Sequence, residues 1–413
     1  MKILWTVNTL MPEVANRIGV SSAHSISWIA AMSKEIIKSE NVSLAIVCGG
    51  AVQNTEKHVL DGITYYIMPN DWNEKDYWEK VLEDYRPDIL HLYGTENGHN
   101  YVVLKNYPQY PAVVSLQGIL TEYYRHYYAG IDFSTMLKYT TIKDLFFPTG
   151  FFSGRNALKK RSKKERMILR EARFVEGRTK WDMYSALNIN PQLKYFYCPR
   201  LIRPPFYQKE WKIDNIERHS IFTTQGFSPE KGLHFLLEAV YKLSKKYPDV
   251  KLYISGIDRL HPKNLRRQLL PSGYDKYLRS LIRKYNLSDR VVFTGVLSAE
   301  EVANMMAKVH TTVLSSSIDN APNALAEAMI VGTPTVASFV GGVMDMLSHN
   351  EDGFLYTYNE PNMLAGYISE IFESDTLSQT FSCNSRQKAR QRHDPKVLSN
   401  KLLTIYEDII KMY

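Results

Sequence analysis

The sequence predicts an α/β protein made of two doubly wound domains, each a parallel sheet with helices on both faces. Short, continuously apolar runs alternate with helical patterns along the whole chain, as expected for buried parallel strands joined by crossover helices. The length of 413 residues suits two domains of about 200 residues each. Residues 198–220 interrupt both periodicities with prolines and aromatic residues, so we place the crossing between the domains there.

The candidate strands are the apolar runs. In chain order they are residues 2–8, 43–49, 88–94, 111–118, 219–226, 250–256, 290–296, 310–316 and 333–339. The clearest helical patterns between them cover residues 25–39, 232–247 and 275–287. This order predicts an N-terminal domain over 1–205, a C-terminal domain over 206–390 and a final helix over 391–413 that packs back on the N-terminal domain. A cleft between two such domains, at the carboxyl ends of the strands, is the expected ligand site.

The composition is that of a globular protein, with 44% apolar and 23% charged residues. Cys48, Cys198 and Cys383 have no metal-ligand spacing, which favours a reducing compartment over a disulfide framework or a zinc site. The N-terminal apolar run is too short for a signal peptide, and no stretch reaches the roughly 18 to 20 apolar residues of a membrane span. We therefore expect a cytoplasmic protein, peripheral on the inner face of the membrane if it binds one. The formal net charge of +8 fits an anionic small ligand, an anionic membrane or a nucleic acid.

Residues 315–338 are the most informative stretch, passing from a polar loop through a helix to an apolar strand. Pro322 suits the first turn of that helix, because the N–H that proline lacks would have no partner there. The amides after it would face a ligand with the helix dipole behind them, and this end of a helix attracts phosphate. Asp319 and Glu327 could then accept hydrogen bonds from sugar hydroxyls on either side of a phosphate. The alternative is an ordinary helix N-terminus, with Asp319 in a turn and Glu327 on a solvated face.

Glycines mark two further corners of the second half. Gly226 and then Lys231-Gly232 lie between a strand and a helix, where a lysine can reach a diphosphate as a point charge. Gly341-Gly342 would let the backbone come close to a ligand. Such corners are common in doubly wound domains, and their order and spacing are more informative than any one of them.

With these motifs the second half resembles the retaining glycosyltransferases of family 4, of the type that builds bacterial surface polysaccharides. In that family a strand leads to a "PEKG" segment, matched here by residues 229–232. An acid, seven residues and a Glu follow, and this chain has Asp319 and Glu327, then "EAMIVGTPTVAS" and "FVGG". The resemblance is close over residues 220–358 and looser over the whole chain. It implies the GT-B fold, two Rossmann-like domains that face each other across a cleft.

The resemblance also implies roles for the motif residues. Lys231 would contact the donor diphosphate, Glu327 would hold the ribose, and Asp319 would bind hydroxyls of the transferred sugar. The Gly226 corner would belong to the donor site, and the phosphate-capping amides would be those of Asn323, Ala324 and Leu325. No metal or other cofactor is expected, and the sequence has no Asp-x-Asp pair of the kind used by metal-dependent transferases.

Three positions depart from the family pattern. Asp319 stands where Glu is usual, one methylene shorter, so its contact with the sugar could be displaced or bridged by water. Gly226 stands where the family often has an arginine; a second phosphate cation is then absent or is one of Arg17, Arg178 and Arg203. Gln117 stands where many members have a histidine beside the reacting centre. Glutamine cannot act as a general base, but it can orient an acceptor hydroxyl or the sugar.

The first half of the chain is less specific. Gly19 lies in a loop before the first predicted helix, where the family approaches the donor phosphate and sugar. His91 and Glu96 belong to a stretch that ends a strand and would face the cleft, and His126 and Arg178 complete the acceptor-side candidates. For each histidine the alternative is a packed or surface residue, and for Arg178 it is a structural ion pair.

A basic segment runs from Arg155 to Arg173. It has nine Lys or Arg against two Glu and follows four phenylalanines. Basic residues beside exposed aromatics suit docking on an anionic membrane, where each charge contributes about 1 kcal/mol, and would bring the enzyme to a lipid-linked acceptor. The alternative is a solvated basic helix face. Nucleic acid is not an expected partner, because no basic residues interleave with aromatics along a strand face.

We therefore predict an enzyme that transfers a hexose from a UDP-linked sugar to a hydroxyl of a glycan or lipid-linked oligosaccharide. Retention of configuration is implied by the resemblance; from the residues alone, no carboxylate of the first half stands out as an inverting base. One alternative is a nucleotide-sugar epimerase or hydrolase of the same architecture, which would turn over the donor without an acceptor. Another is a non-catalytic homologue, with Asp319 and Gly226 as signs of a lost site. The sequence does not identify the sugar, the base, the acceptor, the linkage or the oligomeric state.

Overall fold

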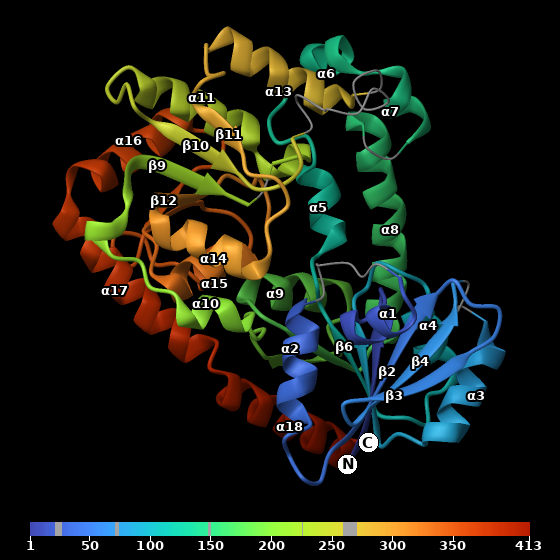
Figure 1. Cartoon of the computed structure of the whole chain (residues 1–413). Helices are drawn as coiled ribbons and strands as arrows, with labels where there is room; N and C mark the ends of the chain where they lie inside the picture. The colour runs from blue at the N-terminus through green and yellow to red at the C-terminus, as the bar shows by residue number, and fades with distance from the viewer. Residues whose placement is uncertain (21–26, 71–73, 148–149, 225, 259–270) are drawn as a thin grey trace. The chain divides into compact units, whose positions relative to one another are not determined.

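The protein is described by a computed structural model that covers residues 1–20, 27–70, 74–147, 150–224, 226–258 and 271–413 (Figure 1). Two compact units each draw on separate stretches of the chain. Unit 1 comprises Met1–Thr121, Lys160–Arg203 and His393–Tyr413, and unit 2 comprises Glu122–Lys159 and Pro204–Arg392. This division differs from the linear one predicted at residue 205, because residues 122–159 belong to unit 2 and the last stretch belongs to unit 1.

Unit 1 is built on an eight-stranded sheet in the order β3-β4-β2-β1-β5-β6-β7-β8. Neighbouring strands are parallel, except that β3 and β4 are antiparallel. The strands are β1 (Lys2–Val7), β2 (Ser43–Gly50), β3 (Glu56–Leu60), β4 (Ile63–Pro69), β5 (Ile89–Tyr93), β6 (Ala112–Ser115), β7 (Phe174–Gly177) and β8 (Lys194–Tyr197). The helices of this unit are α1 (Pro12–Arg17), α2 (Ser27–Ile36), α3 (Lys75–Tyr85), α4 (His99–Asn106), α9 (Lys180–Ile189) and α18 (Pro395–Met412).

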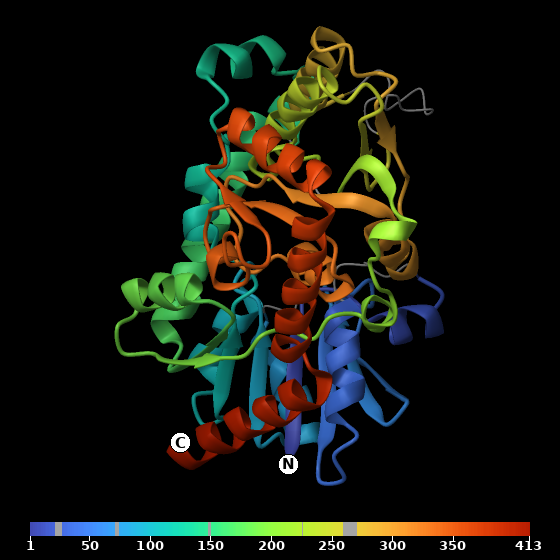
Figure 2. The same ribbon diagram turned by 90° about the vertical axis from the view of Figure 1, so that its left-hand side faces the viewer.

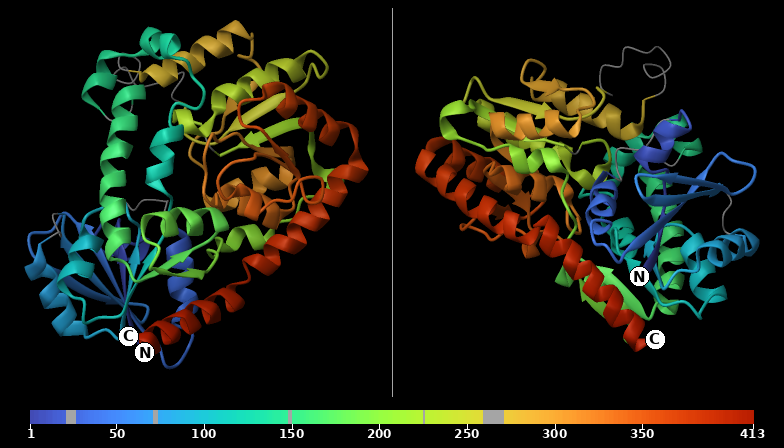
Figure 3. Two further views of the ribbon diagram at one scale, coloured as in Figure 1. Left: turned by 180° about the vertical axis from the view of Figure 1, so that it is seen from behind. Right: turned by 60° about the horizontal axis from the view of Figure 1, so that its bottom comes forward.

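The sheet of unit 1 has a hydrophobic core on each face. Ile3 and Trp5 of β1 pack in one core with side chains of α2 and α18. Leu4, which points to the opposite face, packs in the other core with side chains of α3, α4 and α9. The C-terminal helix is tied to the first strand, because the indole Nε1 of Trp5 donates to the hydroxyl of Tyr406 over 3.0 Å. Both chain ends therefore lie at the same end of unit 1 (Figure 3).

Unit 2 is built on a six-stranded, all-parallel sheet in the order β11-β10-β9-β12-β13-β14. The strands are β9 (Glu217–Thr223), β10 (Lys251–Ile254), β11 (Val291–Phe293), β12 (Val309–Leu314), β13 (Thr335–Ser338) and β14 (Phe354–Tyr356). The helices are α6 (Phe133–Tyr139), α7 (Ile142–Phe146), α10 (Pro204–Gln208), α11 (Leu233–Ser244), α13 (Gly273–Lys284), α14 (Ala299–Lys308), α15 (Asn323–Val331), α16 (Pro361–Glu373) and α17 (Asp375–Arg392). Helix α16 lies against β12, β13 and α11, and α17 lies against α15 (Figure 2). Helices α5 (Leu120–His126) and α8 (Phe151–Glu171) pass through the division between the units.

Residues 122–159 are part of unit 2 because they pack into its core. Ile131, Met136 and Phe151 belong to the same hydrophobic cluster as α11 and α13. The carbonyl of Ala129 accepts a hydrogen bond from Nε2 of His234 over 3.0 Å. A segment that precedes the interdomain stretch in sequence thus completes the C-terminal unit.

Two further observations concern the cysteines and the helices. Cys48 and Cys198 are buried, Cys383 is exposed, and all three are free thiols. None of the helices in the described part of the chain combines the length and the apolar character needed to cross a membrane.

Candidate active site

The candidate site is built on the loop that follows β12 and on the start of α15. The loop side chains Ser315 to Asn320 are buried. Pro322 was predicted in the first turn of the helix but is the residue that precedes it, with φ −65° and an extended ψ of 124°. The helix therefore begins at Asn323, one residue later than the Pro-at-first-turn pattern suggests.

The first amides of α15 differ in their partners. The Leu325 N–H, which was predicted to cap a phosphate, donates to the carbonyl of Pro322 over 3.1 Å and so already has a partner within the chain. The N–H groups of Asn323 and Ala324 donate to no carbonyl or side chain among the residues the structure describes. These two amides, with the positive end of the helix dipole, are the ones left for an anion.

Lys231 lies against this loop because of the glycine after it. It ends a short 3₁₀ turn, η3 (Pro229–Lys231), and Gly232 follows with a φ of +68°. A Cβ at Gly232 would lie 1.9 Å from the carbonyl oxygen of Ser315, so only glycine allows this approach. The ammonium of Lys231 then reaches the carboxylate of Asp319, with an Nζ to Oδ2 distance of 2.9 Å.

The Asp319 carboxylate is surrounded by further hydrogen-bond donors. Its Oδ1 accepts from the Tyr123 hydroxyl over 3.3 Å and from its neighbour's amide, Asn320 N–H, over 3.1 Å. Its Oδ2 accepts from the Ser316 hydroxyl over 3.3 Å as well as from Lys231. The Asn320 amide also donates to the Tyr123 oxygen over 3.1 Å, so Tyr123 bridges the carboxylate and the loop backbone.

The second glycine corner supports the same loop from the other side. Gly341 has a φ of +52°, and a Cβ there would lie 1.9 Å from the carbonyl oxygen of Asp319. The Gly342 N–H donates to that same carbonyl over 3.1 Å. The sequence predicted that the backbone at these glycines comes close to a ligand. In the structure this backbone lies close to the backbone carbonyl of Asp319.

The site brings together buried and half-buried charged residues. Burial lowers the pKa of Lys231, but the Asp319 carboxylate and, more weakly, Glu230 outweigh it and raise the pKa above its usual value. Burial raises the pKa of Glu230, against the opposing hydrogen bond from Ser228. Glu327 lies on α15, one turn after Asn323, and is 5% exposed. It is therefore not on a solvated helix face, which was the alternative for this residue.

The corner at Gly226 has little room for a larger residue. The glycine is buried, and a Cβ there would lie 3.1 Å from Leu233 Cδ2 and 3.3 Å from Ile254 Cγ2. Its neighbour Gln225 lies outside the described residues.

Two of the candidates in the first half of the chain contact each other. Gln117 and Arg178 are joined in unit 1, because the Arg178 guanidinium Nη2 donates to the Gln117 carbonyl over 2.5 Å. The Arg178 N–H also donates to Asp182 Oδ2 over 3.0 Å, at the start of α9. Arg178 therefore braces the turn that carries Gln117, close to the structural role that was its alternative.

The two candidate histidines have different surroundings. His91 lies on β5, is 1% exposed, stacks on Tyr93 and bonds the Tyr406 hydroxyl through Nδ1 over 2.6 Å. Burial lowers its pKa, with Glu176 opposing. It is a packed core residue, so its prediction as an acceptor contact is not supported. His126 is exposed, and its carbonyl accepts from the Ser317 hydroxyl over 2.9 Å, which joins α5 to the Asp319 loop within unit 2.

Glu96 and Gly19 complete the predicted set. Glu96 is half-buried and accepts from Asn8 Nδ2 over 3.1 Å, and burial raises its pKa. Gly19 follows α1, a helix that was not predicted, and has a φ of +72°. A Cβ at Gly19 would meet no described atom within 4 Å, so no close packing requires the glycine there. Residues 21–26 of the same stretch lie outside the described residues.

The basic segment Arg155 to Arg173 was predicted to carry exposed basic residues beside exposed phenylalanines. The basic residues are largely exposed, but two of the phenylalanines are not. Phe151 is buried in the core of unit 2, and Phe152 is half-buried. The Arg155 guanidinium lies 5.4 Å from the centre of the Tyr128 ring, and Glu165 is buried. The outward face of α8 carries the basic side chains of Lys159, Lys160, Arg161, Lys163, Lys164 and Arg170.

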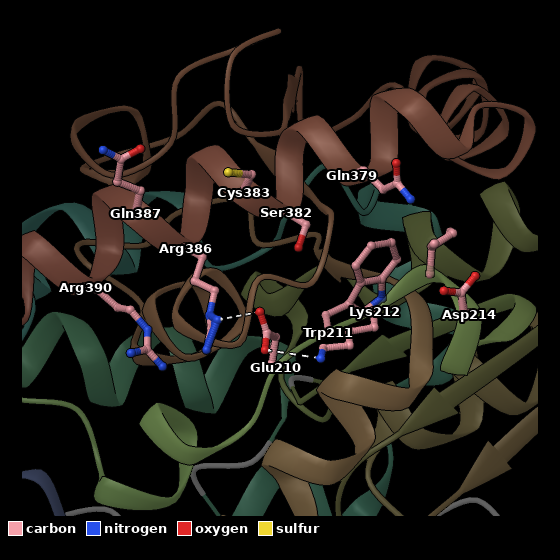
Figure 4. A pocket seen from close by; sticks show the side chains of 11 residues that line it. Glu210, Trp211, Lys212, Asp214, Gln379, Ser382, Cys383, Arg386, Gln387 and Arg390 are labelled. Atoms are coloured by element: carbon pink, nitrogen blue, oxygen red, sulfur yellow. Dashed lines mark ion pairs between the residues drawn. The ribbon is translucent and has the colours of Figure 1, made fainter.

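A surface hollow of about 530 Å³ lies elsewhere on unit 2, between residues 210–214 and α17 (Figure 4). Glu210 lines it and pairs with Arg386 over 3.0 Å and with Lys212 over 3.7 Å. None of the predicted site residues lines it.

Residues 208–388 match the family of group 1 glycosyl transferases. The matched segment contains Lys231, Asp319 and Glu327 and thus the whole pairing described above, but not Tyr123, Gln117 or Arg178. The C-terminal part of the chain is thus similar to this family, and the match covers less than half of the chain.

Curated relatives resemble part of the chain, and solved structures resemble its fold. WcaL of Salmonella typhimurium, whose name assigns it to colanic acid biosynthesis as a glycosyltransferase, is 26% identical over 188 residues, covering 44% of this chain and 43% of WcaL. The chain spans about half the length of the curated relatives it matches. Sucrose-phosphate synthase of Thermosynechococcus elongatus is 16% identical with a TM-score of 0.73, covering 100% of both chains. HepE of Anabaena, solved in complex with UDP and glucose, is 18% identical with a TM-score of 0.66, covering 99% of this chain and 100% of that chain.

The fold predicted from the sequence is confirmed. Both solved structures are GT-B glycosyltransferases, and the two sheets described above are the two Rossmann-like domains of that fold. Tyr123, Ser316 and Ser317 are the site residues that sequence reasoning missed. Tyr123 lies among several tyrosines of residues 123–128, and nothing in that stretch distinguishes the one that reaches Asp319.

Proposed function

We propose that the protein transfers a hexose from a UDP-linked sugar to a hydroxyl of a glycan or lipid-linked acceptor, with retention of configuration, in the synthesis of a surface polysaccharide. The observation that carries this proposal is the pairing of Lys231 with Asp319 beside the first two amides of α15, which have no partner among the described residues. A diphosphate needs such a cation and such amides, and a sugar needs an adjacent carboxylate. The complex of HepE with UDP and glucose supports the choice of donor, and the name of WcaL supports the role in polysaccharide synthesis.

Donor binding would reorganise the Lys231–Asp319 pair. A diphosphate carries more negative charge than a carboxylate, so it competes for the ammonium of Lys231. Asp319 would then exchange one of its donors for a sugar hydroxyl, while Tyr123 and the Asn320 amide keep it in place.

The chemical step would follow from these contacts. The bond between the anomeric carbon and the diphosphate oxygen breaks, and the bond from the acceptor oxygen to the same carbon forms on the same face. The acceptor's proton passes to the departing diphosphate oxygen. Lys231 and the amides of Asn323 and Ala324 stabilise the charge that develops on the diphosphate, and we propose that no metal ion is needed. Glu327 would hold the ribose, and Gln117, braced by Arg178, would orient the acceptor or the sugar.

The direct test is to remove the two charged groups one at a time. We expect Lys231→Ala and Glu327→Gln each to lower transfer from a UDP-sugar by at least about 100-fold, because each removes a charged contact to the donor. The matched control is Lys242→Ala on α11, which removes an equivalent charge from a half-exposed pair with Glu238 and should leave transfer unchanged. Circular dichroism of each variant checks that the fold is intact. Undiminished turnover in both site variants would refute the assignment, and donor turnover without any acceptor would indicate a hydrolase or epimerase instead.

A further inference from the structure

Four large apolar side chains are exposed at one corner of unit 2. They are carried by α6, by α7 and by the residue after α7, and we call them the apolar corner: Phe133, Leu137, Ile142 and Phe147. Their exposed fractions are 62%, 56%, 75% and 54%. Single exposed apolar residues are common on protein surfaces, but four within fifteen residues indicate a contact surface.

The apolar corner is presented by well-anchored helices. Asp132 caps α6 by accepting from the Thr135 N–H over 2.9 Å, and Thr141 and Asp144 form a reciprocal capping box at α7. The Gly273 N–H of α13 donates to Asp144 over 2.8 Å, which ties α7 to the body of unit 2. The exposure of the corner is therefore a property of the folded unit rather than of a frayed segment.

Helix periodicity explains which side chains point outward. Phe133 and Leu137 are four residues apart and share one face of α6, while Met136 points into the core. Ile142 is the first residue of α7 and is the most exposed of the four. Helix α6 also lies against α13, so α6, α7 and α13 meet at this corner (Figure 1).

The charge around the apolar corner is mainly positive. Lys138 and Lys276 are exposed on α6 and α13, and Lys143 is half-exposed on α7. Of the acids nearby, Asp144 and Asp275 are buried in their capping boxes, and Asp132 is exposed but engaged as a helix cap. Lysines that rim large apolar side chains are the pattern of a surface that enters the headgroup layer of an anionic membrane.

We propose that the apolar corner inserts into the surface of an anionic lipid bilayer, with Lys138, Lys143 and Lys276 contacting the lipid phosphates. A second copy of the chain is a poorer occupant, because a symmetric contact would bring these lysines against their own copies. The surface differs from the basic segment Arg155 to Arg173 that the sequence singled out, and Phe151, which precedes that segment, is buried. Membrane binding at the apolar corner does not depend on the proposed transfer reaction. An experiment can therefore refute one of the two proposals and leave the other standing.

The test is co-sedimentation of the whole protein with vesicles. We expect binding to vesicles of 70% phosphatidylcholine and 30% phosphatidylglycerol and little binding to pure phosphatidylcholine. Phe133→Ser combined with Ile142→Ser should weaken binding by at least about tenfold, because two large apolar side chains lose their place in the lipid. Lys138→Gln and Lys143→Gln should each weaken it about fivefold at low salt and less at high salt.

The matched control is Val59→Ser combined with Val397→Ser, which removes two exposed apolar side chains from unit 1, where they are 65% and 58% exposed. This variant should bind like the unaltered protein. The ring centres of Phe133 and Phe152 lie 5.9 Å apart, so replacing Phe133 removes a packing contact of the folded unit. If the double variant is unstable for this reason, Ile142→Ser alone takes its place. Unchanged binding of the Ile142 variant, or equal binding to neutral vesicles, overturns the proposal. A dimer in sedimentation velocity that is lost in the same variant also overturns it and assigns the corner to self-association.

Discussion

At the scale of single residues, Tyr123 shows how a group outside the recognised motif can position one inside it. Its hydroxyl donates to Asp319 Oδ1 and accepts from the Asn320 amide. We expect Tyr123→Phe to lower kcat for transfer about tenfold with a smaller change in the donor KM, because the carboxylate is misplaced while Lys231 is retained. Steady-state kinetics with a UDP-sugar check this, and Tyr124→Phe is the matched control. Equal kcat in the two variants would show that Tyr123 does not position Asp319.

A buried histidine gives a pH dependence of stability in unit 2. His234 is 5% exposed, donates from Nε2 to the Ala129 carbonyl and bonds the Tyr274 hydroxyl through Nδ1 over 3.0 Å. Burial lowers its pKa to about 4, against the opposing hydrogen bond to Ala129. The unfolded chain takes up a proton near pH 6.5, so between about pH 6.5 and 4 the unfolded state binds more protons and the folded state loses stability as the pH falls.

We therefore expect His234→Gln to flatten the fall in unfolding free energy between pH 7 and pH 4 by about 3 kcal/mol. Urea denaturation of both proteins at several pH values measures this difference, and other buried histidines contribute equally to both curves. Curves that stay parallel over this range would mean that folding does not shift the pKa of His234.

The residues that the sequence could predict are those whose spacing is itself the signal. Lys231 precedes a glycine at a strand-to-helix corner, and Asp319 and Glu327 flank a proline corner eight residues apart, so all three were found without the structure. Their roles toward a donor stay predictions. The role of Tyr123 depends on a contact with Asp319, which is far away in the sequence. The hydrogen bond of the Leu325 amide depends on the exact residue at which α15 begins. The periodicity of the sequence reveals neither.

At the scale of elements, the loop after β12 depends on two glycines that admit no side chain. We expect Gly341→Ala to destabilise unit 2 by about 2 kcal/mol or more and to weaken UDP binding, because a Cβ would meet the Asp319 carbonyl oxygen at 1.9 Å with φ at +52°. The matched control is Gly366→Ala on α16, where no described atom lies within 4 Å and alanine should stabilise the helix by about 1 kcal/mol. Thermal unfolding and titration calorimetry with UDP measure both effects. Similar behaviour of the two variants would contradict the close packing of this loop.

Elements were predicted where the apolar pattern was continuous. The runs at β1, β2 and β5 are apolar, and each forms a strand within one residue of the expected bounds. The strands β4, β7 and β8 were missed because tyrosines, glutamate or lysine interrupt short runs, as in "FVEG" and "KYFY". The antiparallel β3 is half polar and exposed at the edge of the sheet, so it lacks the buried pattern.

At the scale of the whole molecule, the units are discontinuous in sequence, and each depends on a distant piece of chain. Helix α18 contributes Leu402 and Tyr406 to the core of unit 1, which is otherwise formed by residues before Arg203. No local pattern predicts that residues 122–159 complete unit 2, because the deciding contacts link them to α11 and α13, a hundred residues away.

Removal of residues 393–413 should therefore loosen unit 1 and leave unit 2 folded. The truncated protein loses the apolar face of α18 and the hydrogen bond from Trp5 to Tyr406. We expect limited proteolysis with mass spectrometry to show new cleavages within residues 1–121 and 160–203 and protection of residues 204–392. Removal of Tyr413 alone is the control and should leave the pattern unchanged. An unchanged pattern in the long truncation would show that α18 is dispensable for unit 1.

The central claim is that the start of α15 and the ammonium of Lys231 together hold a donor diphosphate. A crystal structure of the protein with UDP tests this most directly. The account predicts the β-phosphate within about 3 Å of Lys231 Nζ and of the Asn323 or Ala324 amide, with Asp319 still bonded to Tyr123. A diphosphate bound elsewhere, for example in the hollow beside α17, with the Lys231–Asp319 pair intact, would contradict it.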